Sequence, residues 1–148
     1  MKMKLFAAAV AVIGGAAAMT VNTPATAHHA FSAEFDADLP VALRGPITRV
    51  EWINPHSWIH LDHQTEDGST QAWMAEGGTP NTLLRRGITR NSLQIGTEIV
   101  VTGYQSKDQL CSPACRANGR DITFPDGRKL FMGSSGTGAP DDGSDPTE

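Results

Sequence analysis

Short runs of alternating apolar and polar residues dominate the chain from residue 41 to residue 132, and this period of two is typical of β-strands. In the second predicted strand the apolar side chains of Ile59 and Leu61 fall on one face. The opposite face carries His56, Trp58, His60 and Asp62. An Asp-Gly turn within residues 66–69 leads into a third strand over residues 70–76, so these two strands are predicted to form a hairpin.

Other segments follow the same pattern. The first strand begins at Val41, and its phase changes at Gly45-Pro46, which predicts a bulge or bend. A fourth strand is expected over residues 97–105. Residues 121–124 and 128–132 flank a Pro-Asp-Gly turn and predict a second hairpin.

One segment between the third and fourth strands has helical signals instead. Thr79 can cap a helix, and Pro80 suits its first position. Leu83 and Leu84 are expected on the buried side, two arginines follow near the end, and Gly87 stops the helix. These boundaries predict a helix of about two turns.

Three strands, a short helix and further strands are the element order of a small OB-fold-like β-barrel, which is predicted for residues 41–132. An immunoglobulin-like sandwich is the alternative, but it would not need the helix. Residues 28–40 have no clear period and are expected to form an extended lead-in whose Phe31 and Phe35 dock on the domain. Residues 133–148 are rich in Gly, Ser, Pro and Asp, which predicts a disordered acidic tail.

The N-terminal 27 residues have the three regions of a cleavable export signal. Lys2 and Lys4 precede an uncharged apolar run over residues 5–19. Ala25-Thr26-Ala27 then places small residues where signal peptidase cuts, so cleavage is predicted near Ala27. A retained membrane anchor is the alternative, but the run is shorter than the roughly 20 residues of a spanning helix.

Export would leave 121 of the 148 residues, which suffices for one compact domain in the periplasm or the medium. The signal holds two of the twelve basic residues and no acidic residue, so processing would move the formal net charge from −4 to −6. No basic cluster appears, which disfavours a nucleic-acid partner. The remaining chain has no further apolar run long enough to be a transmembrane segment.

Two cysteines lie in a long predicted loop over residues 106–119. Cys111 and Cys115 form the sequence C-S-P-A-C, and an oxidising compartment favours a disulfide between them. The bridge would close a very small loop and would therefore fix a local turn. A redox switch and a soft-metal site are the functional alternatives.

The order of several motifs resembles that of an uncharacterised domain-of-unknown-function family of short exported bacterial proteins. The motifs are Ala27-His28-His29-Ala30-Phe31, Val50-Glu51-Trp52-Ile53-Asn54-Pro55-His56, Leu84-Arg85-Arg86-Gly87, Gly103-Tyr104 and Pro125-Asp126-Gly127-Arg128-Lys129-Leu130. The resemblance covers about residues 27–135 and implies export and the same architecture. The cysteine-containing loop departs from the shorter, Asn-rich segment of the family. The family brings no established activity, so the resemblance implies no function.

Cleavage after Ala27 would make His28 the new N-terminal residue, and a terminal histidine can chelate a metal through its α-amine and its imidazole. A second imidazole would complete a histidine brace, a nitrogen-rich set that suits Cu(II). The candidate second ligands are His29, His56, His60 and His63. His56 and His60 lie about 13 Å apart along one strand and are not expected to chelate one ion together.

Copper is therefore a possible cofactor, and a solvated leader with no metal is the simpler interpretation of the same residues. Cleavage two residues earlier would start the mature chain at Thr26, with His28 in third position. That arrangement also chelates copper, with a different geometry.

A second candidate site is aromatic. The exposed face of the second and third strands of OB-like barrels commonly binds extended ligands by stacking. Trp58 shares the polar face with His60, so these two residues are the predicted ligand-binding pair, and Trp52 and Trp73 are weaker candidates. The acidic charge leaves a sugar, a peptide or a small aromatic molecule as the ligand. Buried packing is the alternative role for any of the three tryptophans.

Signals of catalysis are weak. Glu34, Glu51 and Glu76 could act as acids or bases, but no spacing selects a pair, and Ser57 beside His56 makes no triad. The leading hypothesis is an exported, soluble, non-enzymatic binding module for an unknown small molecule. The alternatives are a copper-binding protein and a structural partner of an envelope protein complex.

Overall fold

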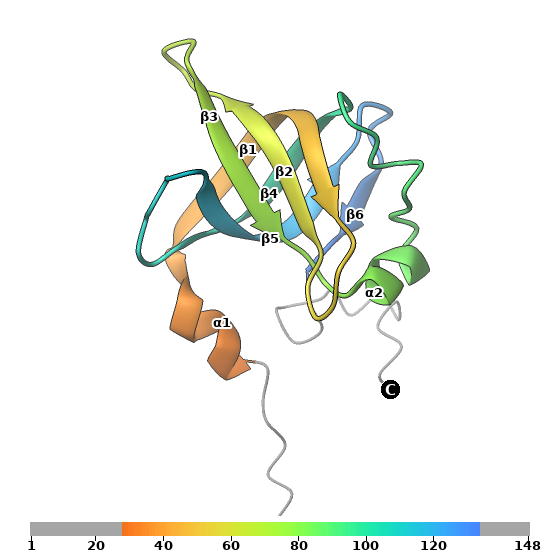
Figure 1. The fold of residues 1–148 in the computed structure, drawn as a ribbon, viewed down its shortest axis with the longest axis horizontal. Helices are drawn as coiled ribbons and strands as arrows, with labels where there is room; N and C mark the ends of the chain where they lie inside the picture. Colours follow the sequence, from red (N-terminus) through yellow and green to blue (C-terminus); the bar gives the residue numbers. More distant parts are fainter. Residues whose placement is uncertain (1–27, 134–148) are drawn as a thin grey trace, which may run out of the picture.

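The computed structural model describes residues 28–133, with side chains from residue 31 onward. The predicted signal and all but the first residue of the predicted tail lie outside this part of the chain. Figure 1 shows a ring of strands with two short helices near one end. The elements are α1 (His28–Glu34), β1 (Phe35–Glu51), β2 (Trp58–Gln64), β3 (Thr70–Glu76), α2 (Pro80–Arg85), β4 (Glu98–Ser106), β5 (Cys115–Thr123) and β6 (Lys129–Phe131).

The long strand β1 connects the two halves of the sheet. Its second half pairs antiparallel with β2, and its first half pairs antiparallel with β4. Antiparallel pairs β2–β3, β4–β5 and β5–β6 extend the sheet, and a parallel pair between β3 and β5 closes the ring β1-β2-β3-β5-β4. The mainly β, OB-fold-like prediction with a helix between the third and fourth strands is therefore confirmed.

The interior of the ring is filled by the apolar faces of the strands. Ile59 and Leu61 of β2 are fully buried, as the alternation of that strand predicts. Their partners across β3 are Ala75 and Trp73, which are also buried. The polar face of β2 therefore lies on the outside of the ring.

Helix α2 begins and ends where the sequence indicates. Thr79 is the N-cap, and its side chain accepts a hydrogen bond from the backbone N–H of Thr82. Gly87 has a φ of 80°, a left-handed conformation that glycine adopts without strain. Leu83 is buried as predicted, whereas Leu84 is 48% exposed, because neighbouring helical residues point about 100° apart.

The prediction of an extended lead-in over residues 28–40 is wrong for residues 28–34, and it places the start of the first strand too late. His28–Glu34 forms helix α1, and β1 begins at Phe35 rather than Val41. An irregular register in the β1–β4 pairing between Phe35 and Pro40 disrupts the alternation, so the sequence pattern hides the strand there. Phe31 packs against Phe35 and against Tyr104 of β4, and Phe35 is buried, so both phenylalanines dock on the domain as expected.

Two other boundaries differ from the prediction. The irregularity between β1 and β2 lies between Ile47 and Arg49, slightly after the expected Gly45-Pro46. Strand β5 begins at Cys115, where a loop up to residue 119 was predicted. Its polar and glycine residues give no strand pattern, and pairing with both β3 and β4 overrides this weak local preference.

Candidate functional site

The outer face of strands β1, β2, β3 and β5 carries two rows of side chains that run across the strands. Opposed residues in adjacent strands lie on the same face of a sheet. The first row is Glu51, Trp58, Glu76 and Asn118. The second row is Arg49, His60, Met74 and Arg116. We call these eight residues the Trp58 face, because Trp58 has a carboxylate directly opposite it on either side.

On the β1 side, Glu51 joins the two rows. Its Oε1 lies 2.9 Å from Nε2 of His60 and 3.1 Å from Nη2 of Arg49. The side chains of Glu51 and His60 are 23% and 18% exposed, whereas Arg49 extends into solvent. The sequence pattern identifies His60 as a candidate ligand-binding residue. It does not predict the contact with Glu51, because that contact depends on the register in which β1 and β2 pair.

On the β3 side, the loop residue His56 contacts Glu76. Nδ1 of His56 lies 3.1 Å from Oε1 of Glu76, whose side chain is 10% exposed. Burial raises the pKa of the Glu76 carboxyl, while the charge of His56 lowers it, Glu34 raises it and Arg116 lowers it. Glu76 is therefore a shielded carboxyl within the Trp58 face, beside Asn118, which is also buried.

Helix α1 is attached beside this carboxyl. Oε2 of Glu34, its last residue, lies 2.9 Å from Nη2 of Arg116 on β5. Lys107 also donates from its backbone N–H and its ammonium group to carbonyl oxygens of α1. The end of α1 therefore borders the Trp58 face at β5.

The three tryptophans have different environments. Trp58 is partly exposed in the centre of the face, which matches the position expected for a stacking residue. Trp73 is 8% exposed and lies in the core, so the packing alternative applies to it. Trp52 packs partly against the core, and the guanidinium of Arg90 lies 5.1 Å from its ring centroid.

The four predicted metal ligands are not brought together by the described side chains. His56 and His60 bond to different carboxylates, and the side chains of His28 and His29 lie outside the described part. Within residues 31–133, no group of three or more His, Cys, Asp or Glu side chains is arranged to hold a metal ion. His63 lies elsewhere, where its Nδ1 contacts the backbone of Arg44.

Cys111 and Cys115 form the predicted disulfide. Cys111 is exposed, whereas Cys115 is 2% exposed and belongs to the core at the start of β5. The bridge therefore joins the loop after β4 to the first residue of β5, beside the parallel pairing with Trp73 of β3.

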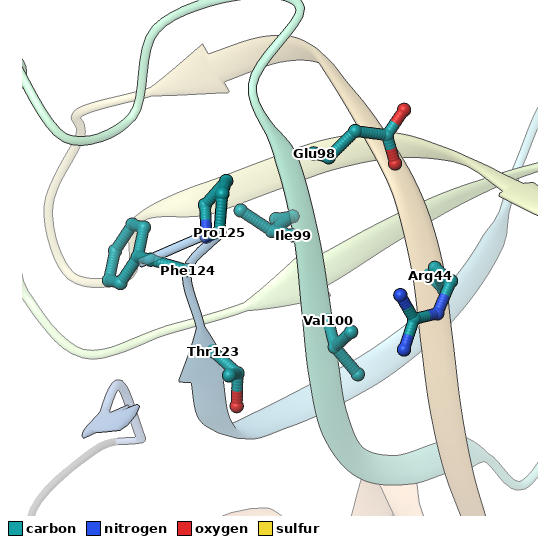
Figure 2. Close-up of a pocket in the computed structure, with 7 residues that line it drawn as sticks. All are labelled: Arg44, Glu98, Ile99, Val100, Thr123, Phe124 and Pro125. Atoms are coloured by element: carbon teal, nitrogen blue, oxygen red, sulfur yellow. The ribbon is translucent and has the colours of Figure 1, made fainter. Parts of the chain in front are cut away.

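A shallow depression of about 350 Å³ lies on another side of the ring. Figure 2 shows its lining residues on β1, β4, the end of β5 and the turn that follows it, with the side chains of Arg44, Val100 and Thr123 beside one another. Strand β4 lies between β1 and β5, so it is farthest from β2 and β3 in the ring. Because the depression contains none of the histidines or tryptophans, we place the candidate site on the Trp58 face.

Sequence reasoning missed how Glu51, Glu76, Arg116 and Asn118 contribute to this face. The register of the β2–β3 hairpin could have been predicted from its Asp-Gly turn. Pairing residues outward from that turn places Glu76 opposite Trp58. No comparable signal existed for Arg116 and Asn118, since the parallel β3–β5 pairing joins segments about 40 residues apart.

Family comparison covers most of the folded part of the chain. The family model DUF6152, a family of unknown function, matches residues 17–112. The chain belongs to this family. Within the match lie α1, α2 and the strands β1 to β4, which carry Trp58 and both carboxylates of its row. The expected membership of an uncharacterised family is thus confirmed.

None of the curated proteins matches this DUF6152 protein significantly. Among residues 28–133, none of the helices has the length and apolar character required to cross a membrane.

Proposed function

We propose that this protein is an exported binding module that holds its ligand across the Trp58 face. The observation that carries the proposal is the position of Trp58, a partly exposed indole with Glu51 and Glu76 opposite it on the two adjacent strands. Large aromatic side chains with a few oriented polar groups are the usual composition of ligand sites. The outer face of the second and third strands is also the surface that OB-folds use most often.

The polar groups around Trp58 are held in place before any ligand arrives. His60 fixes Glu51, and His56 fixes Glu76, at 2.9 Å and 3.1 Å. Preorganised side chains lose little conformational entropy on binding. The face is therefore suited to recognition.

Export and release into the periplasm or the medium are part of the proposal. The order of charged, apolar and small residues over residues 1–27 supports it, as does the disulfide between Cys111 and Cys115, since oxidising compartments favour such bonds. Intact-mass measurement of protein recovered from the periplasm of a bacterial host should give a chain that begins at His28. An uncut chain retained in the cytoplasm would contradict this part.

A fragment screen by saturation-transfer NMR tests the binding site. Fragments that bind wild-type protein should bind Trp58→Ala at least about fivefold more weakly, since one lost stacking contact is worth about 1–3 kcal/mol. Arg44→Ala, in the depression of Figure 2, is the matched control and should leave these affinities unchanged. Equal affinities for wild type and Trp58→Ala would contradict the proposal.

A copper-binding protein is the second candidate function. The observation that favours it is the carboxylate of Glu76 beside Nδ1 of His56, because metal-ligating histidines commonly bond a carboxylate through their other ring nitrogen. His28 would supply the α-amine and an imidazole after cleavage. Cu(II) titration of the processed protein with electron paramagnetic resonance should show a nitrogen-rich, one-to-one site that N-acetylation and His56→Ala both weaken. Binding that is indifferent to the α-amine would exclude the histidine brace.

A further inference from the structure

We infer that the ligand of the Trp58 face is a neutral oligosaccharide, an inference that rests on the binding function proposed above. The first reason is that charged groups on the face already have partners within the protein. Glu51 contacts Arg49 and His60, Glu76 contacts His56, and Arg116 contacts Glu34. A charged ligand would have to compete with these pairs, whereas a neutral ligand can bind beside them.

The second reason is the hydrogen-bonding capacity that remains. A carboxylate offers about four acceptor sites, so one or two bonds to neighbouring side chains leave room for hydroxyl donors. Within the first row the accessible carboxylate is that of Glu51, because Glu76 and Asn118 are buried. Hydroxyl groups both donate and accept, so a sugar can bond to the carboxylate of Glu51 and the imidazole of His60, while its apolar C–H face covers Trp58.

The third reason is the shape of the face. The second row, from Arg49 to Arg116, crosses four strands, or about 14 Å at the usual strand spacing, and its side chains are exposed or partly exposed. A row of this length fits several linked sugar rings better than one ring. It also lies on the open outer surface of the ring, where a small apolar molecule would not be enclosed.

Other extended ligands fit this surface less well. A peptide that adds a strand needs unpaired backbone groups at a sheet edge. Across the Trp58 face, the backbone of β1 is already paired with β2, that of β2 with β3, and that of β3 with β5. A nucleic acid is disfavoured by the net charge of −4 and by the equal number of carboxylates and guanidiniums in the two rows.

The test is a set of titrations of the full processed protein, followed by intrinsic tryptophan fluorescence and isothermal calorimetry. The neutral probes are maltohexaose, cellohexaose and chitohexaose. The comparison probes are a hexauronate, a dT oligonucleotide, spermine and an unstructured peptide. Trp58→Phe, Trp58→Ala and Glu51→Gln change the face, and Glu98→Gln is the charge-matched control on the other side of the ring.

At least one neutral hexasaccharide should bind, with affinity at least about fivefold lower in Trp58→Ala and about threefold lower in Glu51→Gln. Glu98→Gln should bind as wild type does. Because the ligand carries no charge, its affinity should change less than twofold between about 0.05 and 0.5 M salt, over which exposed ionic contacts are screened.

Two other results would overturn the inference in different ways. If a charged probe or the peptide binds in a Trp58-dependent manner and no neutral sugar does, the binding function stands and the carbohydrate inference falls. If no probe shows a Trp58-dependent affinity, both the inference and the proposed site fall.

Discussion

At the scale of single residues, Glu76 shows how position determines chemistry. Its sequence context gives no reason to separate it from Glu34 or Glu51. In the structure its side chain is 10% exposed, beside His56 and opposite Trp58. The alternation of β2 and the Asp-Gly turn predicted the exposed side of Trp58 and His60, whereas the acids opposite them depend on strand register. The residue pattern therefore predicts which side chains of β2 face outward, and the strand register determines which acids lie opposite them.

The pH dependence of stability follows from Glu76. Burial raises its pKa above the ordinary 4.5, so the folded protein holds this proton more tightly than the unfolded chain. Stability should therefore fall as the pH rises from 4.5 through the raised pKa. Thermal unfolding of Glu76→Gln should show a smaller fall than wild type over this range, and Glu98→Gln serves as the control for loss of one carboxylate. The same pH profile in wild type and Glu76→Gln would contradict this assignment.

At the scale of elements, closure of the ring depends on positions where two backbones approach closely. The sequence predicted the helix α2 well, because caps and stop signals are local. It predicted β5 poorly, because pairing with β3 and β4 is not local. The sequence predicts a bend at Gly45-Pro46, but the irregular pairing lies between Ile47 and Arg49, and Gly45 is instead a point of close backbone approach. A methyl group at Gly45 would overlap the backbone carbonyl of Asp62 on β2.

Gly45→Ala should therefore destabilise the protein. Neither backbone can move aside without disturbing the β1–β2 or β1–β4 pairing, so we expect a loss of about 1–3 kcal/mol in the free energy of unfolding. Urea denaturation followed by circular dichroism measures this loss. An unchanged urea midpoint would show that the backbone of Gly45 does not lie against the carbonyl of Asp62.

At the scale of the whole molecule, stability comes from the closed ring and its core rather than from the disulfide. The bridge spans only four positions in sequence. Loop-closure entropy for such a short loop is worth about 2 kcal/mol in the chain-entropy account. The core includes residues from all strands of the ring, and the family match extends over most of it.

Removing the bridge should accordingly leave a folded protein. Cys111→Ser keeps the buried Cys115 in place and should lower the free energy of unfolding by about 2 kcal/mol. The measurement is chemical denaturation at equilibrium, with the circular dichroism spectrum as a check of the fold. A variant that does not fold would show that the bridge is required to position β5.

The central claim is that the Trp58 face is the ligand site. The most direct test is a ¹H–¹⁵N correlation spectrum of the processed protein, recorded while a bound fragment or neutral hexasaccharide is titrated. The largest shifts should occur at the indole N–H of Trp58 and at the amides of Glu51, His60 and Glu76. Shifts concentrated around Arg44, Val100 and Thr123, in the depression of Figure 2, would contradict the claim.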